Sequence, residues 1–511
     1  MKKFLLPALI CPWISLASPS EEKIQTLYSR LDPLSIPQQL SLYELYPESN
    51  EGQKALNNAW RLLSQSDSPP DNAIVKALLG KGEINAFVDF LLSMRSDSEY
   101  QLSPEELKAI NTLSHTLSNR KLKGFYATNE EEVLALPPHE VDVSQALLLS
   151  LFGNDLENRE QMLQYNAMLD VMALQIRAHL IPDADHISKI NAISQFIFHE
   201  MRFRFPPESL YAKSIDFYTF LPSVLQSRKG VCLGVSTLYL CLAQRLDLNL
   251  EIITPPGHIY LRYNDGDSVI NIETTARGIH LPSEKYLSIN TRELQKRNAK
   301  EVVGMNYFNQ AAIFWQHKEH DKAIEAYEKA LLYTPKDALT IELLAYNYLA
   351  SGQQYKARQL LQSLPSEIPY YMVAKETFAE DFLNGNVDSE GIQVIFSHVD
   401  ETRESILEKQ NQLLSILKKY PKFRAGIFHL AVTWMQLNRY GEALDTLDHY
   451  HELHPDNPTV EYYLAALHTQ RYNYKAAWKH LHQAIKLTSQ REHNPIALHF
   501  LKQSIKRYYP E

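Results

Sequence analysis

Three residues in the middle of the chain carry side chains that could act together in catalysis: Cys232, His258 and Glu273. A thiolate is a nucleophile, an imidazole can accept and return a proton, and a carboxylate can orient the ring and stabilise its protonated form. If the three meet, they could attack an amide or ester carbonyl and form an acyl-enzyme. We predict no organic cofactor and no metal, because the close ligand spacings of a zinc site are missing. A zinc site from these residues is the less favoured alternative.

The cysteine is predicted to begin a helix over residues 231–246. Gly230 precedes it and would let the chain turn sharply there. Apolar residues follow at the spacing of one buried helix face: Val235, Leu238, Leu242 and Leu246. The positive end of the helix dipole and the free backbone N–H groups of a first turn both favour a thiolate at Cys232.

A second cysteine, Cys241, lies nine residues further along the same predicted helix. At the helical rise, the two cysteines are about 13 Å apart, whereas a disulfide needs Cα atoms closer than about 7 Å. We therefore interpret Cys241 as inert packing and Cys232 as the reactive thiol.

The histidine and the glutamate are predicted to lie on paired strands, over residues 252–263 and 268–274. Asp265-Gly266 between them is a strong hairpin signal. With that turn, the numbers of facing residues sum to 531, as do those of His258 and Glu273. The two would then be direct cross-strand neighbours, with Cβ atoms about 5 Å apart. Singly, each of the three residues is more often structural; together they favour an active site.

Arg262 shares the predicted face of His258 and could contact a substrate carboxylate or pair with Glu273. Gln226 lies six residues before Cys232. An oxyanion hole would need the backbone N–H of Cys232 and a second donor. Gln226 could be that donor, and a plain surface glutamine is the equal alternative.

Three motifs resemble the bacterial transglutaminase-like superfamily: Arg228-Lys229-Gly230-Val231-Cys232-Leu233-Gly234, Gly257-His258, and Asn271-Ile272-Glu273-Thr274-Thr275. The chain is most similar to the branch that joins this core to tetratricopeptide repeats. The resemblance covers about residues 140–300 and the repeats. It implies a papain-like core with Cys232 as nucleophile, His258 as base, Glu273 as orienting acid, and a glutamine at the spacing of Gln226. Many members carry Asp at the third position, and some members of the branch have lost the cysteine.

From residue 304 a pattern of 34 residues recurs on two registers, 304–371 and 424–491. Small residues recur where the helices of a pair would cross: Ala311, Ala323, Ala345, Ala357, Ala431, Ala443, Ala465 and Ala477. This is the tetratricopeptide pattern of a helix-turn-helix solenoid. Stacked repeats form a concave groove, and the pattern places four aromatic residues there: Phe308, Tyr346, Phe428 and Tyr462. An aromatic groove suits a protein partner or an extended peptide; the alternative is that some of these residues only pack between helices.

The composition is that of an ordinary globular protein, with 45% apolar and 22% charged residues. A net charge of −9 without a basic block argues against nucleic acid as a partner. The first residues, Met1-Lys2-Lys3, an apolar run and Ser15-Leu16-Ala17, are typical of a signal peptide. We expect cleavage after Ala17, a periplasmic or secreted protein, and no transmembrane segment in the mature chain. Cys11 raises a weaker lipoprotein alternative.

With 511 residues the chain is too long for one hydrophobic core. The predicted fold is α+β: a helical N-terminal region, a papain- or transglutaminase-like α+β core, and an all-α solenoid. The predicted segments are 1–17 signal peptide, 18–139 helical region, 140–300 core, 304–371 repeats, 372–423 helical insert or degenerate repeat, 424–491 repeats, and 492–511 capping helix. The predicted function is a cysteine hydrolase or acyltransferase, such as a peptidase or amidase, acting on a peptide, protein or cell-wall peptide. The alternative is a scaffold without catalysis in the cell envelope.

Overall fold

The computed structural model describes residues 20–65, 101–153, 155–207, 215–397, 399–400 and 402–510. The expected signal peptide and the helical segments predicted at 73–79 and 84–92 lie outside these residues. The chain divides into two compact units, one of Met1–Ser114 with Leu174–Pro182 and one of His115–Ala173 with Asp183–Glu511. Among the described helices, none has the length and apolar character needed to cross a bilayer.

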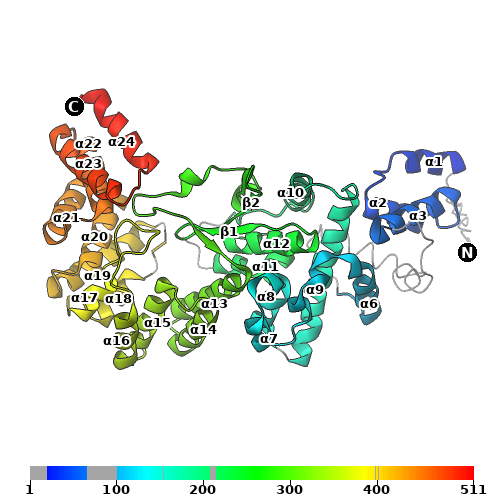
Figure 1. Ribbon diagram of the computed structural model, residues 1–511, viewed down its shortest axis with the longest axis horizontal. Helices are drawn as coiled ribbons and strands as arrows, with labels where there is room; N and C mark the ends of the chain where they lie inside the picture. The colour runs from blue at the N-terminus through cyan, green and yellow to red at the C-terminus, as the bar shows by residue number, and fades with distance from the viewer. Residues whose placement is uncertain are drawn as a thin grey trace, which may run out of the picture. The chain divides into compact units, whose positions relative to one another are not determined.

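The described part of the first unit is helical (Figure 1). They are α1 (Glu21–Ser29), α2 (Ile36–Leu45), α3 (Asn50–Ser64) and α6 (Pro104–Leu113). The Ser49 hydroxyl accepts a bond from the Gly52 N–H at the start of α3. Ser103 and Glu106 form a capping box at the start of α6. Helix α3 packs against α2 and buries Ala55, Ala59 and Leu63, which agrees with the predicted helical character of this region.

The second unit contains a further set of helices, with the last residues of α9 belonging to the first unit. They are α7 (Glu130–Ala135), α8 (Val143–Phe152), α9 (Leu156–Ala178), α10 (His186–Ser194), α11 (Leu221–Ser227) and α12 (Cys232–Arg245). A π-helical turn, Gln195–Glu200, continues α10. The short 3-10 helices used below are η2 (Ser118–Lys121), η6 (Ile215–Thr219), η7 (Thr274–Ala276) and η8 (Ser283–Tyr286). An antiparallel sheet follows in the order β3-β2-β1-β4, with β1 (Glu251–Thr254), β2 (Tyr260–Asn264), β3 (Val269–Ile272) and β4 (Gln295–Arg297). The predicted α+β core is confirmed.

The prediction of one strand over residues 252–263 is wrong. The structure divides it into β1 and β2, which pair antiparallel. Between them, Pro255 and Pro256 have no N–H to donate to a ladder, and Gly257 adopts a φ of +69°. The His258 N–H donates to the Pro255 carbonyl at 3.0 Å. His258 therefore lies in a turn at the end of the sheet.

The predicted register of the next hairpin is also wrong. Facing residues of β2 and β3, such as Leu261 and Ile272, have numbers that sum to 533. Gly266, with a φ of +97°, opens the turn, and the Asp265 carboxylate accepts the N–H groups of Asp267 and Ser268. The turn is thus centred one residue later than predicted. Because the sum changes by two, every side chain keeps its face.

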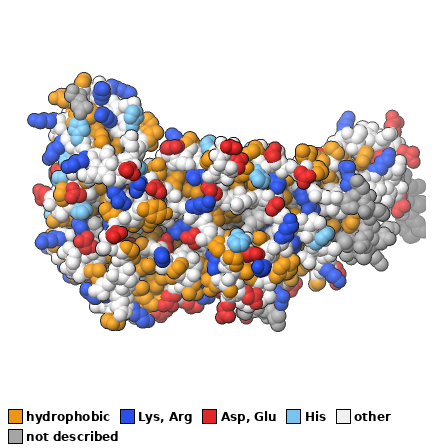
Figure 2. Space-filling model, viewed as in Figure 1, with side chains coloured by type: hydrophobic (Ala, Val, Ile, Leu, Met, Phe, Trp, Pro, Cys, Tyr) orange, Lys and Arg blue, Asp and Glu red, His pale blue; other side chains and the backbone are white. Residues whose placement is uncertain are grey.

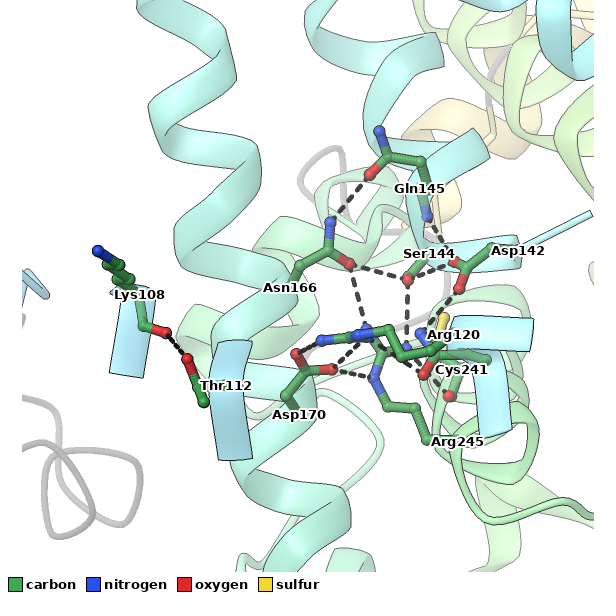
Figure 3. Close-up of polar contacts among 11 residues, drawn as sticks. Lys108, Thr112, Arg120, Asp142, Ser144, Gln145, Asn166, Asp170, Cys241 and Arg245 are labelled. Carbon is green, nitrogen blue, oxygen red and sulfur yellow. Dashed lines mark hydrogen bonds and ion pairs between the residues drawn. The ribbon is translucent and has the colours of Figure 1, made fainter. Parts of the chain in front are cut away.

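A buried polar network surrounds Arg245, the last residue of α12 (Figure 3). Arg245 is 1% exposed. Its Nε donates to Asp170 of α9 at 2.8 Å, and its other nitrogens donate to Ser144 of α8 and Asn166 of α9, each at 3.2 Å. Arg120 of η2 also pairs with Asp170. Since a buried charge is tolerated only when it is paired and hydrogen-bonded, this network fixes α12 against α8 and α9.

Beyond the sheet the chain folds into helix pairs (Figure 1). The pairs are α13 (Ala299–Gln316) with α14 (His320–Tyr333), α15 (Ala338–Ala350) with α16 (Gln354–Ser363), α20 (Arg424–Gln436) with α21 (Tyr440–Leu453), and α22 (Pro458–Gln470) with α23 (Tyr474–Ser489). The eight alanines predicted at the helix crossings are all 0% exposed: Ala311, Ala323, Ala345, Ala357, Ala431, Ala443, Ala465 and Ala477. Larger side chains there would hold the paired backbones apart, so the solenoid prediction is confirmed.

The segment predicted as an insert or degenerate repeat contains α17 (Phe378–Leu383), α18 (Ser389–Ile395) and α19 (Arg403–Lys419). Helix α18 packs on α15, and α19 packs on α20, so the segment continues the stack with shortened helices. At the end of the chain, α24 (Ile496–Tyr508) buries Leu498 and Ile505 against the last pair, as a capping helix does. On the face drawn in Figure 2, acidic and basic side chains are interspersed.

We expect Asp170→Asn to lower the free energy of unfolding by about 3–5 kcal/mol, because it leaves the buried Arg245 without its counter-charge. Urea unfolding followed by circular dichroism measures this. Lys123→Ala is the matched control, since it breaks the exposed Lys123–Glu140 pair and should leave the midpoint in place. Equal midpoints for all three proteins would contradict the anchoring role of the network.

Candidate active site

Cys232 is the first residue of α12, as predicted, and its side chain is partly exposed. The N-cap residue is Val231, which has no side-chain acceptor, so no side-chain cap covers the first turn. The Val231 N–H itself donates to the Tyr218 carbonyl at 3.0 Å. The N–H groups of Cys232, Leu233 and Gly234 belong to the helix start, where backbone donors lack intrahelical partners. The thiol therefore lies beside donors that can stabilise negative charge.

The glycines near Cys232 serve close packing. A Cβ on Gly230 would lie 2.5 Å from Cγ2 of Val235, and one on Gly234 would lie 2.4 Å from the Tyr218 carbonyl oxygen. Neither glycine has a positive φ; the left-handed residue here is Arg228, with a φ of 53°, at the end of α11. The expectation that Gly230 provides a sharp turn is therefore wrong, because lack of space, and not backbone conformation, is what requires a glycine there.

The His258 ring joins the other two residues of the predicted site. Its Nε2 is 2.7 Å from Oε2 of Glu273, and the ring interacts with the Cys232 side chain, which acts to raise the pKa of the imidazole. Because Nε2 faces the carboxylate, Nδ1 is the ring nitrogen that is not bonded to Glu273. His258 and Glu273 are not direct cross-strand neighbours, since both lie beyond the paired ends of their strands. The structure nevertheless brings all three residues together.

Glu273 is 3% exposed and is held by further donors. The Tyr286 hydroxyl donates to Oε2 at 2.5 Å, and the Thr275 hydroxyl and N–H donate to Oε1 at 2.6 and 3.1 Å. The Tyr286 ring also stacks on the His258 ring, with centroids 5.7 Å apart. Sequence reasoning missed both residues as site residues. Thr275 follows Glu273 by two residues in the motif of residues 271–275, whereas only the fold brings Tyr286 of η8 to the carboxylate.

The position of Glu273 relative to the cysteine helix is set by a neighbouring contact. The Ser236 hydroxyl, one helical turn after Cys232, is 2.9 Å from the Thr274 hydroxyl, and both residues are buried. Thr274 directly follows Glu273 and begins η7. This hydrogen bond therefore ties the helix that bears the thiol to the segment that bears the acid.

Burial and hydrogen bonding have opposite effects on the pKa values of His258 and Glu273. Burial disfavours a charged His258 ring, but its interactions with the Cys232 and Glu273 side chains outweigh burial and raise its pKa to about 9. Burial likewise acts to raise the pKa of Glu273, but the bonds from His258, Thr275 and Tyr286 hold it at about 2. At neutral pH the site therefore holds a protonated imidazole and a charged carboxylate. Burial raises the pKa of the Cys241 thiol well above its usual range, which agrees with inert packing.

Two further predicted residues are engaged elsewhere. The Gln226 amide is exposed and donates to the Tyr165 hydroxyl at 2.9 Å, and within the described residues no hydrogen bond joins it to Cys232. Arg262 donates to Asn271, Tyr260 and Ser283. Its guanidinium links β2 and β3 to η8 through these hydrogen bonds. The suggested pairing with Glu273 is wrong, because the guanidinium is bonded to these residues instead. Its suggested contact with a substrate carboxylate remains untested.

The predicted groove aromatics pack largely within the repeats. Tyr346 is 2% exposed and belongs to the core, so it does not line a groove. Phe308 meets Tyr327 edge-on within its own helix pair. Phe428 contacts Tyr450 and Tyr463. Tyr462 is half-buried against the last pair. The alternative, packing between helices, accounts for Tyr346 and Phe308.

Comparison with known proteins supports the resemblance. Residues 163–307 match the family model described as "Transglutaminase-like superfamily". The middle of the chain is therefore a transglutaminase-like domain. No curated protein matches the chain.

Similar solved structures include "MamA MSR-1 C2", 16% identical over 37% of this chain and 97% of that one, with a TM-score of 0.19. They also include TTC0263, titled a thermophilic TPR protein in Thermus thermophilus, 16% identical over 40% and 98%, with a TM-score of 0.21. A third is YrrB, titled a TPR protein with an unusual peptide-binding site, 14% identical over 39% and 92%, with a TM-score of 0.21. The assignment of the repeats in this chain rests on its own helix pairs and their buried alanines.

We expect Glu273→Gln to lower the pKa of His258 from about 9 toward its usual range, because the variant removes a charge that stabilises the protonated ring. NMR titration of the ring protons measures the pKa directly. The folded-state pKa is raised, so the bonded ring stabilises the fold fully below about pH 6.5 and loses this contribution as the pH rises through about 9. Glu284→Gln, an exposed change nearby, is the control. A pKa that is the same in all three proteins would refute the coupling.

Proposed function

We propose that the transglutaminase-like domain is a cysteine hydrolase or acyltransferase that cleaves an amide or ester bond through an acyl-enzyme. One observation carries the proposal: Cys232, at a helix start without a side-chain cap, interacts with His258, and His258 is hydrogen-bonded to Glu273. A nucleophile, a base and an orienting acid in series are the constellation of covalent acyl transfer. The protonated His258 ring lies beside the thiol, where it can give its proton to a leaving group.

The proposed mechanism assigns each residue a step. The Cys232 sulfur attacks the carbonyl carbon, and the developing oxyanion is stabilised by backbone N–H groups at the start of α12. His258 gives its proton to the leaving amine or alcohol as the C–N or C–O bond breaks. The neutral ring then removes a proton from water or from an amine, which attacks the thioester and releases Cys232. Glu273 holds the ring in orientation throughout and stays charged.

The acyl acceptor decides between hydrolysis and crosslinking, and both use the same first half-reaction. We propose a peptide or protein as the acyl donor, since the partly exposed thiol is accessible at the helix end. We also propose that the protein is exported, because a basic start followed by a short apolar run and small residues at 15 and 17 fits a signal peptide. Peptides or proteins of the cell envelope are then the expected substrates.

The scaffold function has an observation of its own. A cavity of about 330 Å³ lies among α19, α20 and α21, and its lining includes Leu417, Ile427, Leu430 and Thr446. An apolar side chain of a bound peptide fits such a cavity. This second function is compatible with the first, because a repeat array that holds a protein can present it to the catalytic domain.

We expect iodoacetamide to alkylate Cys232 below pH 8 and to leave the buried Cys241 unmodified in the folded protein. His258→Ala should slow the labelling by about tenfold or more, and Glu273→Gln should slow it less. Mass spectrometry of tryptic peptides follows each cysteine separately. Cys241→Ala is the matched control and should label as the parent does. Equal and slow modification of both cysteines would end the case for catalysis.

We expect Thr446→Trp to fill the cavity and to weaken binding of peptides selected on the full chain by about tenfold or more. Fluorescence anisotropy measures the affinity, and Cys232 labelling should not change. Asp445→Asn, beside it on the same lining, keeps the cavity volume and serves as the control. Unchanged binding in Thr446→Trp would place the peptide site elsewhere.

A further inference from the structure

A cluster of polar side chains lies inside the last repeats, away from the candidate active site. It contains Asp448 and His451 of α21, Glu461 and His468 of α22, and His480 of α23. Helices α21 and α22 pack together, as do α22 and α23. Residues three or seven positions apart share a helix face, so each of the first two helices turns both of its members toward one interface. Glu461, His468 and His480 are 1%, 9% and 5% exposed.

The buried Glu461 fixes the orientation of one ring in the cluster. Its Oε2 is 2.9 Å from Nδ1 of His480, and its Oε1 is 2.5 Å from Nδ1 of His451. A carboxylate on one ring nitrogen holds the proton there and leaves the other nitrogen with a free lone pair. Nε2 of His480 is thereby prepared to accept a Lewis acid.

A second imidazole and a carboxylate meet the His480 ring. Ligand atoms of Asp448, His468 and His480 all lie within 4.8 Å of one another. The rings of His468 and His480 have centroids 5.5 Å apart. Two imidazoles that share a tetrahedral zinc ion, with bonds of about 2.0–2.1 Å, have centroids roughly 5 Å apart.

The His468 ring is nine-tenths buried, and its plane lies at 16° to that of His480. The carboxylate of Asp448 completes a set of three ligand atoms from α21, α22 and α23. A cation placed among these atoms would be held by residues of all three helices.

We propose that Asp448, His468 and His480 bind one divalent transition-metal ion of the zinc class, with Glu461 as the outer carboxylate that orients His480. Two imidazoles and a carboxylate are a ligand set that Zn²⁺ accepts, with a fourth position for water. Because the ligands come from three successive helices, the ion joins the last two helix pairs of the solenoid. Its role is to stabilise the end of the repeat array.

The same cluster offers a second set, His451, Glu461 and His480. Here the two oxygens of Glu461 are already bonded at 2.5 and 2.9 Å to the ring nitrogens. Ligand atoms around a tetrahedral zinc ion lie roughly 3.3 Å apart, so an ion in this set would have to break both hydrogen bonds. The first set needs no such loss.

The test uses the full chain with Cys232→Ala, which removes the partly exposed thiol as a competing ligand. After treatment with a chelator, Zn²⁺ is titrated by isothermal calorimetry, and Co²⁺ is added separately to record its visible absorption spectrum. We expect one tightly bound Zn²⁺ per chain, a tetrahedral cobalt spectrum, and a higher melting temperature with Zn²⁺ than without. His468→Ala and His480→Ala should each weaken Zn²⁺ binding by about 100-fold, and Glu461→Gln by about 10–100-fold.

His482→Ala is the matched control, since it removes an exposed histidine of the same helix and should bind as the parent does. Circular dichroism verifies that each variant is folded, and Asp448→Asn, a change of one charge at a partly exposed position, is the mildest probe of the ligand set. Zn²⁺ binding that survives both His468→Ala and His480→Ala overturns the proposal, as does the absence of binding to the parent. Loss of binding in His451→Ala with full binding in Asp448→Asn would also overturn the proposed ligands.

Discussion

The buried ion pair between Arg245 and Asp170 fixes helix α12 in place. This constraint is needed to hold the Cys232 thiol at the start of the helix in one position relative to His258. Arg245 ends the helix that Cys232 begins, so the helix is anchored at one end and bears the candidate nucleophile at the other. Two arginines share the one carboxylate of Asp170, and neutral oxygens of Ser144 and Asn166 complete the coordination. Such networks specify one arrangement of helices when every member is satisfied, and here the specified arrangement includes the orientation of the thiol.

The sheet positions His258 and Glu273, and both residues lie just outside the strands, at their ends. His258 follows a turn forced by two prolines, and Glu273 follows the last residue of β3. Side chains at strand ends are less restricted by the ladder, so they depend on other contacts for their orientation. Thr275, Tyr286 and the bond between Ser236 and Thr274 provide these contacts. They also compensate for the burial of the charged Glu273 carboxylate.

The helix pairs of the repeats are stabilised differently from the transglutaminase-like domain. Their packing rests on alanines that let helix backbones approach, and each pair contacts mainly its neighbours. An array of this kind is weakest at its ends, which need a cap. Helix α24 covers the last pair with apolar side chains, while the cluster around Glu461 introduces polar groups into the same region. Polar groups buried inside a solenoid require polar partners within it. The histidines around Glu461 therefore indicate where a ligand could bind.

The sequence by itself determined the features that depend on local periodicity. The helix that begins at Cys232, the inert Cys241, the α+β core and the alanine grid of the repeats follow from residue spacing, because helix faces and repeat crossings recur at fixed intervals. The tertiary structure alone decided the rest. The predicted register was wrong because the Asp265 carboxylate and Gly266 recentred the turn. Neither the meeting of Tyr286 with Glu273 nor the burial of Tyr346 leaves a local signal, since contacts between distant segments depend on how whole elements pack.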